Sequence, residues 1–158
     1  MAVSKDIILA LYRAYGSGDP VAIAALLADE VIWVAPPGNA TQVALDMGHG
    51  ADAGPPDGSN NLGKAAIIDF MVNDFARLFT NATNVFTLIL EDGDHVMVEH
   101  RLSATLVNGR SYVNDYCFVF RVANGRVIAI REYMDTRGGW VQMFGTAEGE
   151  PVLSLLTT

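Results

Sequence analysis

The chain has 158 residues, of which 51% are hydrophobic and 18% are charged, and its formal net charge is −8. These values predict one globular domain, residues 1–158, and exclude an intrinsically disordered chain. No apolar run approaches the ~20 residues that a membrane-spanning helix needs. The negative charge argues against nucleic acids and anionic membrane surfaces as partners, because their binding depends on basic surfaces.

The cysteine and histidine content gives no support for a cofactor. Cys117 is the only cysteine, which excludes an internal disulfide and a thiolate zinc site. The three histidines, His49, His95 and His100, lack the close spacing typical of metal ligands, so we expect neither a metal nor another cofactor. The N-terminal segment lacks the basic leader of a signal peptide, so we expect the protein in the cytoplasm.

Two helices and a strand are predicted first along the chain. Residues 4–15 carry apolar side chains at helical spacing, and Asp19 and Pro20 begin a second short helix as its N-cap and first-turn residue. Residues 30–37, "EVIWVAPP", predict a strand that two prolines end. Residues 38–61 are rich in Gly, Pro, Asn and Asp, which predicts a long loop that serves as a lid, a binding loop or a disordered segment.

A longer helix and an antiparallel meander are predicted next. The apolar stripe of residues 62–80 predicts the helix. Alternating segments joined by Asp-Gly and Asn-Gly turn signals predict the strands of the meander, at residues 84–91, 95–107, 110–123 and 126–136. Helices followed by a meander indicate an α+β domain in which the helices pack on one face of the sheet.

The two Asn-Gly pairs predict which side chains share a face of the sheet, because side chains alternate along a strand. If both pairs form two-residue turns, His100, Cys117 and Glu132 lie in one row across three strands, with Asp115 diagonal to it. The residues expected to surround this row are Val98, Ala104, Val119, Ile130 and Met134.

The opposite face of the sheet is predicted to be aromatic and polar. Its expected residues are Glu99, Arg101, Ser103, Tyr112, Asn114, Tyr116, Phe118, Phe120, Arg131, Tyr133 and Asp135. Aromatic residues and arginine are enriched in subunit interfaces, so we expect a homodimer through this outer face. A single β-bulge would exchange the two faces over part of the sheet.

Glu132 is a carboxylate between Ile130 and Met134 on a face that is otherwise mostly apolar. If helices cover this face, burial raises the pKa of a carboxyl group and lowers that of an imidazole, and both shifts favour proton transfer at neutral pH. The candidate catalytic residues are therefore Glu132, His100 and Asp115. The alternatives are a buried ion pair or a hydrogen-bonded core acid for Glu132, an orienting role for His100, and a solvated position at the sheet rim for Asp115.

Aromatic and apolar residues complete the predicted site. The expected substrate-binding residues are Tyr12, Trp33, His49, Phe70, Cys117, Ile130 and Met134. Tyr12 and Trp33 would form part of the wall. Cys117 is either a small core residue or a nucleophile, and His49 is a solvated loop residue unless a lid carries it inward.

The segment "YVNDYCFVFRVANGRVIAIREYMDT", residues 112–136, resembles the C-terminal part of SnoaL-like proteins, and especially of the phenazine-biosynthesis A/B proteins. The shared features are the Tyr-x-Asn opening, the Asn-Gly turn and the Arg-Glu-aromatic-Met ending. The order of helices and strands is similar to that of the NTF2-like superfamily over nearly the whole chain. This resemblance implies a cone with a deep apolar pocket, in which N-terminal helices pack on the concave face of a curved antiparallel sheet.

The resemblance also implies a role for Glu132. The phenazine proteins use a glutamate at the matching position as acid and base, and limonene epoxide hydrolase has an aspartate there. The hydrolase also needs an arginine and an aspartate on the neighbouring strand, where this chain has His100 and Leu102. That difference argues against epoxide hydrolysis.

Three functions are compatible with the sequence. The first is a cofactor-independent acid/base enzyme of lyase, isomerase or cyclase type, acting on a small hydrophobic substrate that is aromatic or polycyclic. The superfamily includes polyketide cyclases, steroid isomerases, dehydratases and a cofactor-free lyase that deformylates lignin-derived diarylpropanes. The second is a non-catalytic module that binds a hydrophobic ligand or another protein, and the third is a dimerisation domain with a vestigial pocket.

Overall fold

The computed structural model describes residues 4–45 and 61–145. Its helices are α1 (Ser4–Ser17), α2 (Pro20–Leu26), α3 (Ala40–Leu45), α4 (Lys64–Asp69), the π-helical turn η1 (Phe70–Asp74), α5 (Phe75–Leu78) and α6 (Thr136–Phe144). Its strands are β1 (Leu27–Val34), β2 (Asn61–Gly63), β3 (Phe79–Asp92), β4 (His95–Leu106), β5 (Ser111–Ala123) and β6 (Arg126–Met134). Across these two ranges, no helix has both the length and the apolar character needed to cross a membrane.

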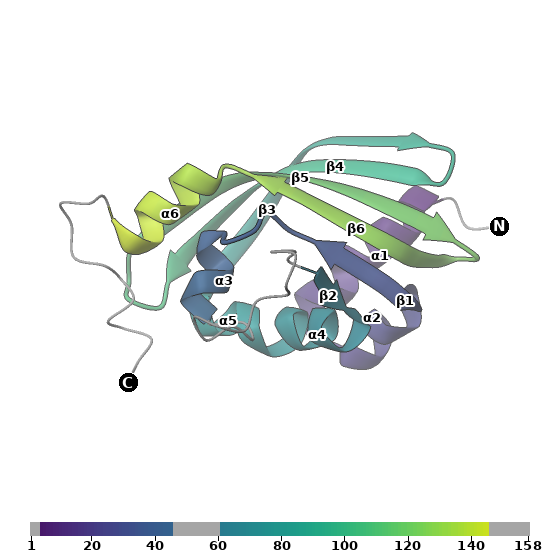
Figure 1. Ribbon diagram of the computed structural model, residues 1–158, viewed down its shortest axis with the longest axis horizontal. Helices are drawn as coiled ribbons and strands as arrows, with labels where there is room; N and C mark the ends of the chain where they lie inside the picture. Colours follow the sequence, from purple (N-terminus) through teal and green to yellow (C-terminus); the bar gives the residue numbers. More distant parts are fainter. Residues whose placement is uncertain (1–3, 46–60, 146–158) are drawn as a thin grey trace.

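The six strands form one curved, open sheet in the order β2-β1-β6-β5-β4-β3. Strand β1 pairs with β6 in parallel, and the other neighbouring strands pair antiparallel. In Figure 1, α1, α2, α4 and α5 lie together against one face of the sheet, and α6 lies at one end of it, near α3. The arrangement confirms the expected α+β fold with helices on one sheet face.

The N-terminal helices form for the local reasons that the sequence indicates. Helix α1 buries an apolar stripe made of Ile7, Ile8, Leu11 and Ala14. Asp19 caps α2, because its carboxylate accepts hydrogen bonds from the backbone N–H groups of Val21 at 2.9 Å and Ala22 at 3.1 Å. The cap pairs backbone donors that the helix itself leaves unpaired.

The loop expected over residues 38–61 contains α3 and the first residue of β2. Residues 46–60, among them His49, and residues 146–158 lie outside the described part of the chain. The predictions of a lid and of a substrate contact by His49 fall on those residues.

The helix predicted over residues 62–80 is interrupted by η1, where one turn is wider than in an α-helix. Such π-turns insert an extra residue and often occur at functional sites. Phe70 at the start of η1 and Phe75 just after it lie edge to face, with ring centroids 6.2 Å apart. Both residues line the cavity described below.

The first Asn-Gly pair forms a longer turn than expected. Leu106 and Arg110 close it, with N–H to carbonyl distances of 2.8 Å from Leu106 to Arg110 and from Gly109 to Leu106. Three residues, 107–109, therefore lie between this closing pair, and Gly109 adopts a φ of +87° that favours glycine. His100 consequently lies opposite Tyr116 rather than Cys117.

The second Asn-Gly pair forms the expected two-residue turn, because Ala123 lies opposite Arg126. A β-bulge follows immediately on β6, where Ile128 is the extra residue between the partners of Val122 and Arg121, so that Glu132 lies opposite Phe118. The two irregularities shift the pairing by one residue each. As a result β5 alone is inverted relative to the prediction, while β4 and β6 keep their predicted faces.

The inversion of β5 corrects the predicted faces of the sheet. The aromatic and amide side chains expected outside are turned toward the helices, with Tyr112, Asn114, Tyr116 and Phe120 buried. Asp115 is instead exposed, and Cys117 and Val119 are half-buried. The predicted straight row through Cys117 and the predicted aromatic outer face on β5 are both wrong.

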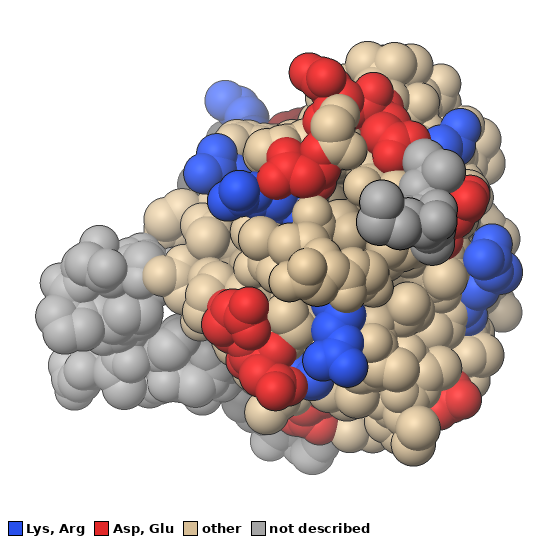
Figure 2. All heavy atoms as spheres, turned by 90° about the vertical axis from the view of Figure 1, so that its right-hand side faces the viewer, with Lys and Arg blue, Asp and Glu red and all other residues tan. Residues whose placement is uncertain are grey.

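Charged side chains of both signs gather at the end of the molecule that carries the β3–β4 and β5–β6 turns (Figure 2). Asp94 pairs there with His95 Nδ1 at 2.6 Å and with Arg121 Nε at 2.8 Å. The pair of Asp94 with Arg121 joins the two hairpins near their turns, but exposed ion pairs contribute little to stability.

Candidate active site

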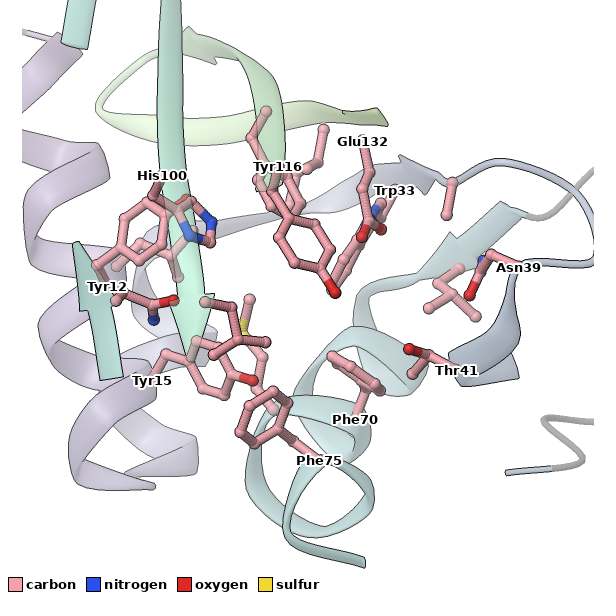
Figure 3. Close-up of a pocket in the computed structure, with 18 of the residues that line it drawn as sticks. Tyr12, Tyr15, Trp33, Asn39, Thr41, Phe70, Phe75, His100, Tyr116 and Glu132 are labelled. Atoms are coloured by element: carbon pink, nitrogen blue, oxygen red, sulfur yellow. Dashed lines mark hydrogen bonds between the residues drawn. The ribbon is translucent and has the colours of Figure 1, made fainter. Parts of the chain in front are cut away.

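A largely apolar cavity lies between the helices and the sheet face that they cover (Figure 3). Its volume is about 90 Å³, and it opens to solvent at its mouth. The lining residues from the helices and the segments next to them are Leu11, Tyr12, Tyr15, Ala35, Asn39, Thr41, Gln42, Phe70, Met71 and Phe75. Those from the strands are Trp33, Leu62, Phe79, Asn84, His100, Leu102, Tyr116, Phe118, Phe120, Ile130 and Glu132.

Glu132 is the acidic residue of this lining. Its side chain comes from β6 and is held by Trp33 on the neighbouring strand β1, whose indole N–H donates to Oε2 at 2.9 Å. The other oxygen, Oε1, has no hydrogen-bond partner within the described part of the chain. Glu132 is only 9% exposed. Burial raises the pKa of its carboxyl group from 4.5 to about 8, against the smaller opposing effect of the Trp33 hydrogen bond.

His100 is the second ionisable group of the lining, and it is 5% exposed. Neither Nδ1 nor Nε2 has a hydrogen-bond partner. Among the described residues, these two nitrogens are the buried polar side-chain atoms that lack one. Burial lowers the pKa of His100 to about 4, and the negative charge of Asp115 opposes this shift. The imidazole is therefore neutral at pH 7, with one donor and one acceptor available.

His100 and Glu132 do not contact each other. They stand two strands apart and are offset by two residues along β5, which separates their Cα atoms by about 12 Å. Figure 3 shows the side chain of Tyr116 between them. The orienting role that the sequence left open for His100 therefore involves no direct contact with Glu132, although the two line one cavity.

Aromatic rings separate these two polar groups. The His100 ring stacks on Tyr116 with centroids 5.4 Å apart and on Phe118 with centroids 5.6 Å apart. Phe118 stacks in turn on Phe120 at 5.8 Å. On the far side of the cavity, Trp33 meets Phe70 edge to face at 5.3 Å. Parallel and edge-on rings of this kind form a rigid apolar wall.

The structure places Asp115 outside the cavity. It forms a two-bond pair with Arg101 on the outer sheet face, at 2.7 Å and 2.8 Å, and this pairing lowers the pKa of the Asp115 carboxyl group. The prediction that Asp115 lies in the enclosure is therefore wrong, and the reason is the inversion of β5.

Cys117 and Met134 are also absent from the lining of the cavity: Cys117 lies on the outer face with Asp115, and Met134 packs against the core beside the cavity. Burial raises the pKa of the Cys117 thiol, and the charge of Glu99 adds to the effect. A raised pKa lowers the thiolate fraction and argues against a nucleophilic role. The expected substrate contacts through Cys117 and Met134 are thus corrected.

Six predicted site residues do come together in one cavity. They are Tyr12, Trp33, Phe70, His100, Ile130 and Glu132. Sequence reasoning missed the lining residues of β5, Tyr116, Phe118 and Phe120. A signal for them was present, because Asp115 and Arg121 alternate with these aromatic rings along the strand, so burying the aromatic side would have left both charges outside.

The cavity provides one carboxyl group, one neutral imidazole and several tyrosine hydroxyl groups, which suits proton transfer and hydrogen bonding. No group of three or more His, Cys, Asp or Glu side chains in the described ranges could hold a metal ion.

Comparison with known proteins gives a family and a fold. A family model for the SnoaL-like domain matches residues 8–130, which is most of the chain. A search of curated proteins found no match.

Three solved structures are informative. An NTF2-like protein of unknown function from Burkholderia pseudomallei is 22% identical, with a TM-score of 0.67, and the match covers 87% of this chain and 94% of that one. IdmH from Streptomyces antibioticus, a proposed polyketide cyclase, is 20% identical, with a TM-score of 0.68 and coverage of 88% and 96%. TerC, crystallised with polyporic acid, is 21% identical, with a TM-score of 0.64 and coverage of 85% and 92%. At these identities the likeness shows the NTF2-like fold.

Proposed function

This chain belongs to the SnoaL-like domain family, and on that premise we propose that it is a cofactor-independent proton-transfer enzyme acting on an apolar substrate. Glu132 is the residue that accepts and returns the proton. The observation that carries this proposal is its carboxyl group beside the cavity, with one oxygen held by Trp33 and the other without a partner in the described residues. An anchored group with one free oxygen suits proton transfer to a bound molecule.

The ionisation of Glu132 supports the proposal. A general acid or base works best when its pKa lies near the operating pH, and burial raises the pKa of Glu132 to about 8. The acid form therefore predominates at pH 7. If Glu132 begins the reaction as a base, the rate rises with pH until the carboxyl group is ionised; if it begins as an acid, the rate falls over the same interval.

His100 supplies a second polar contact to the substrate in this proposal. A buried imidazole without a hydrogen-bond partner is costly unless a ligand pairs with it. Its Cα lies about 12 Å from that of Glu132. A molecule that reaches both groups is extended or polycyclic, and the aromatic wall between them favours an apolar middle part.

Cyclase chemistry has additional support among the lyase, isomerase and cyclase reactions. IdmH is a proposed polyketide cyclase, and TerC was crystallised with polyporic acid. A polyketide chain offers an acidic C–H group and a ketone to the same carboxyl group. We therefore propose cyclisation of a polyketide-like substrate as the reaction, with isomerisation and C–C bond cleavage as the alternatives that use the same residues.

The test is a comparison of wild-type protein with Glu132→Gln on polyketide-like ketones, aromatic diols and epoxides, without added cofactor. The substitution keeps the shape of the side chain and removes its ability to exchange a proton. We expect a loss of about 100-fold or more in kcat, in line with the usual contribution of general acid/base catalysis. Glu30→Gln, at an exposed position of β1, is the matched control and should keep wild-type turnover. Equal turnover by Glu132→Gln and wild type would refute the assignment.

We also propose that two copies pair through the outer sheet face. Apolar side chains are exposed there on three strands, with Val85 60%, Val113 44% and Tyr133 54% exposed. Light scattering at micromolar concentration should give the mass of a dimer, and Val85→Glu should convert it to a monomer. A monomeric wild-type protein would refute this pairing.

A further inference from the structure

A chain of buried hydrogen bonds leads from the end of the sheet to the cavity, and it begins at Asn114. The backbone N–H of Asp115 donates to Asn114 Oδ1 at 3.0 Å. Asn114 Nδ2 donates to the carbonyl oxygen of Asp135 at 3.2 Å and to the hydroxyl oxygen of Tyr112 at 3.1 Å. The first two contacts determine the orientation of the amide, so the Tyr112 hydroxyl accepts a hydrogen bond from it.

The next link is the contact between the hydroxyl oxygens of Tyr112 and Tyr116, which lie 3.0 Å apart. Tyr112 is 1% exposed, and within the described residues the Tyr116 oxygen is the acceptor that its proton can reach. If Tyr116 donated instead, the proton of Tyr112 would be buried without an acceptor, which is unfavourable. The favoured direction therefore runs from Asn114 to Tyr112 to Tyr116.

Tyr116 has one proton of its own, which this arrangement leaves available to the cavity. Figure 3 shows the hydroxyl group of Tyr116 pointing into the cavity, toward the side where Glu132 and Trp33 lie. Tyr116 and Glu132 are diagonal neighbours on adjacent strands, a spacing that long side chains can bridge. One bound molecule can therefore contact both groups.

Helix α6 packs closely over the buried part of the chain. A Cβ atom at Gly139 would lie 3.2 Å from Asn114 Nδ2 and 3.3 Å from the Tyr112 hydroxyl oxygen, closer than most real contacts. Glycine at this position lets the helix backbone approach the pair. The approach helps to exclude water that would otherwise compete for the hydroxyl groups.

We propose that Tyr116 is a catalytic residue that donates a hydrogen bond to the carbonyl oxygen of the substrate, with Asn114 and Tyr112 as positioning residues. The substrate class is then a ketone with an acidic C–H group next to its carbonyl. This inference rests on the function proposed above for Glu132 and adds the group that stabilises the intermediate.

The reaction balances without any redox partner. The carboxylate of Glu132 takes the proton from the carbon next to the carbonyl, and the electron pair of the broken C–H bond forms the enolate. Tyr116 stabilises the negative charge on the enolate oxygen by its hydrogen bond. In a cyclisation, the enolate carbon then forms a bond to a second carbonyl carbon of the same molecule, and the resulting alkoxide takes the proton back from Glu132.

A binding experiment in the Glu132→Gln protein separates this inference from the proposed function. 4-Nitrophenol, whose ionised form is coloured, imitates the enolate, and 4-nitroanisole is a non-ionisable ligand of similar shape. We expect Tyr116→Phe to weaken binding of the nitrophenolate by about 10- to 100-fold relative to nitroanisole, as for a lost hydrogen bond to a charged acceptor. Absorbance should show the acid dissociation constant of the bound nitrophenol falling by the same factor, which raises its pKa by about 1 to 2 units.

Two further variants complete the experiment. Tyr112→Phe should lower the nitrophenolate-to-nitroanisole affinity ratio in the same direction but less, which a merely structural effect would not do. Tyr133→Phe removes a hydroxyl group from the outer face and should leave the ratio unchanged. An unchanged ratio in Tyr116→Phe, an equal loss for both ligands, or no saturable binding of either ligand would overturn the inference. If Glu132→Gln keeps full turnover while the Tyr116 effect persists, the proposed proton-transfer role fails and the Tyr116 donor stands.

Discussion

The buried carboxyl group of Glu132 should make the stability of the folded protein depend on pH. The folded protein holds the carboxyl proton up to about pH 8, whereas the unfolded chain releases it near the ordinary pKa of 4.5. Unfolding between these two values therefore releases a proton, and rising pH favours the unfolded state. Above about pH 8 both states are ionised at this residue, so its contribution no longer changes.

The magnitude follows from the interval between the two pKa values of Glu132. Each pKa unit corresponds to about 1.4 kcal/mol, so the interval from 4.5 to about 8 amounts to about 5 kcal/mol of stability. Glu132→Gln cannot ionise and should lack this loss. Relative to wild type, the variant should gain about 5 kcal/mol between pH 4.5 and pH 9, because its uncharged side chain stays in the buried site at no electrostatic cost.

Urea unfolding followed by circular dichroism at a series of pH values measures this difference. The contributions of other ionisable groups are common to the two proteins and cancel in the comparison. Glu30→Gln, which changes an exposed glutamate, should follow the wild-type curve at every pH. Parallel curves for wild type and Glu132→Gln would refute the reasoning, because they would mean that the carboxyl group titrates as it does in water.

Three further predictions follow from neighbouring contacts. Trp33→Phe removes the hydrogen bond that lowers the pKa of Glu132, so the pH at which the carboxyl band ionises in the infrared spectrum should move above about 8; an unchanged midpoint would contradict the role of the indole. The wild-type protein should lose about 3 kcal/mol of unfolding free energy as pH falls from 6.5 to about 4, because protonation of His100 in the unfolded chain disfavours folding. His100→Gln should not show this loss. Urea titrations at those pH values check this, and an equal loss in both proteins would argue against it. Asp115→Asn should leave turnover unchanged and the unfolding midpoint nearly so, because the pair with Arg101 is exposed; a large fall in kcat would place Asp115 back in the mechanism.

The helices, the meander and the inward position of Glu132 could be predicted because each depends on local patterns. The spacing of apolar residues, the Asp19 cap and the two-residue turn at Asn124 need no knowledge of the rest of the chain. The parallel pairing of β1 with β6 could not be predicted in the same way. It joins segments about a hundred residues apart, and it brings Trp33 to Glu132.

The faces of β5 were mispredicted for a specific reason. An Asn-Gly pair fits two-residue and three-residue turns alike, since glycine accepts the positive φ that both require. The bulge at Ile128 on β6, opposite Arg121 and Val122, has no turn residue to mark it. The two one-residue shifts add up to two residues, which is the repeat of side chains along a strand, so His100 and Glu132 were placed on the correct face although the predicted register between them is wrong.

The three-residue turn at Val107–Gly109 also has an evolutionary consequence. Loss of a single codon there would shorten the turn, and a β5 strand that followed it would present Asp115 and Cys117 to the cavity in place of the aromatic rings and Tyr116. A change in the length of a hairpin turn far from the reacting atoms can thus replace all the side chains that a strand presents to the cavity. Relatives of this chain could acquire new substrates through a change in loop length, with no substitution in the pocket itself.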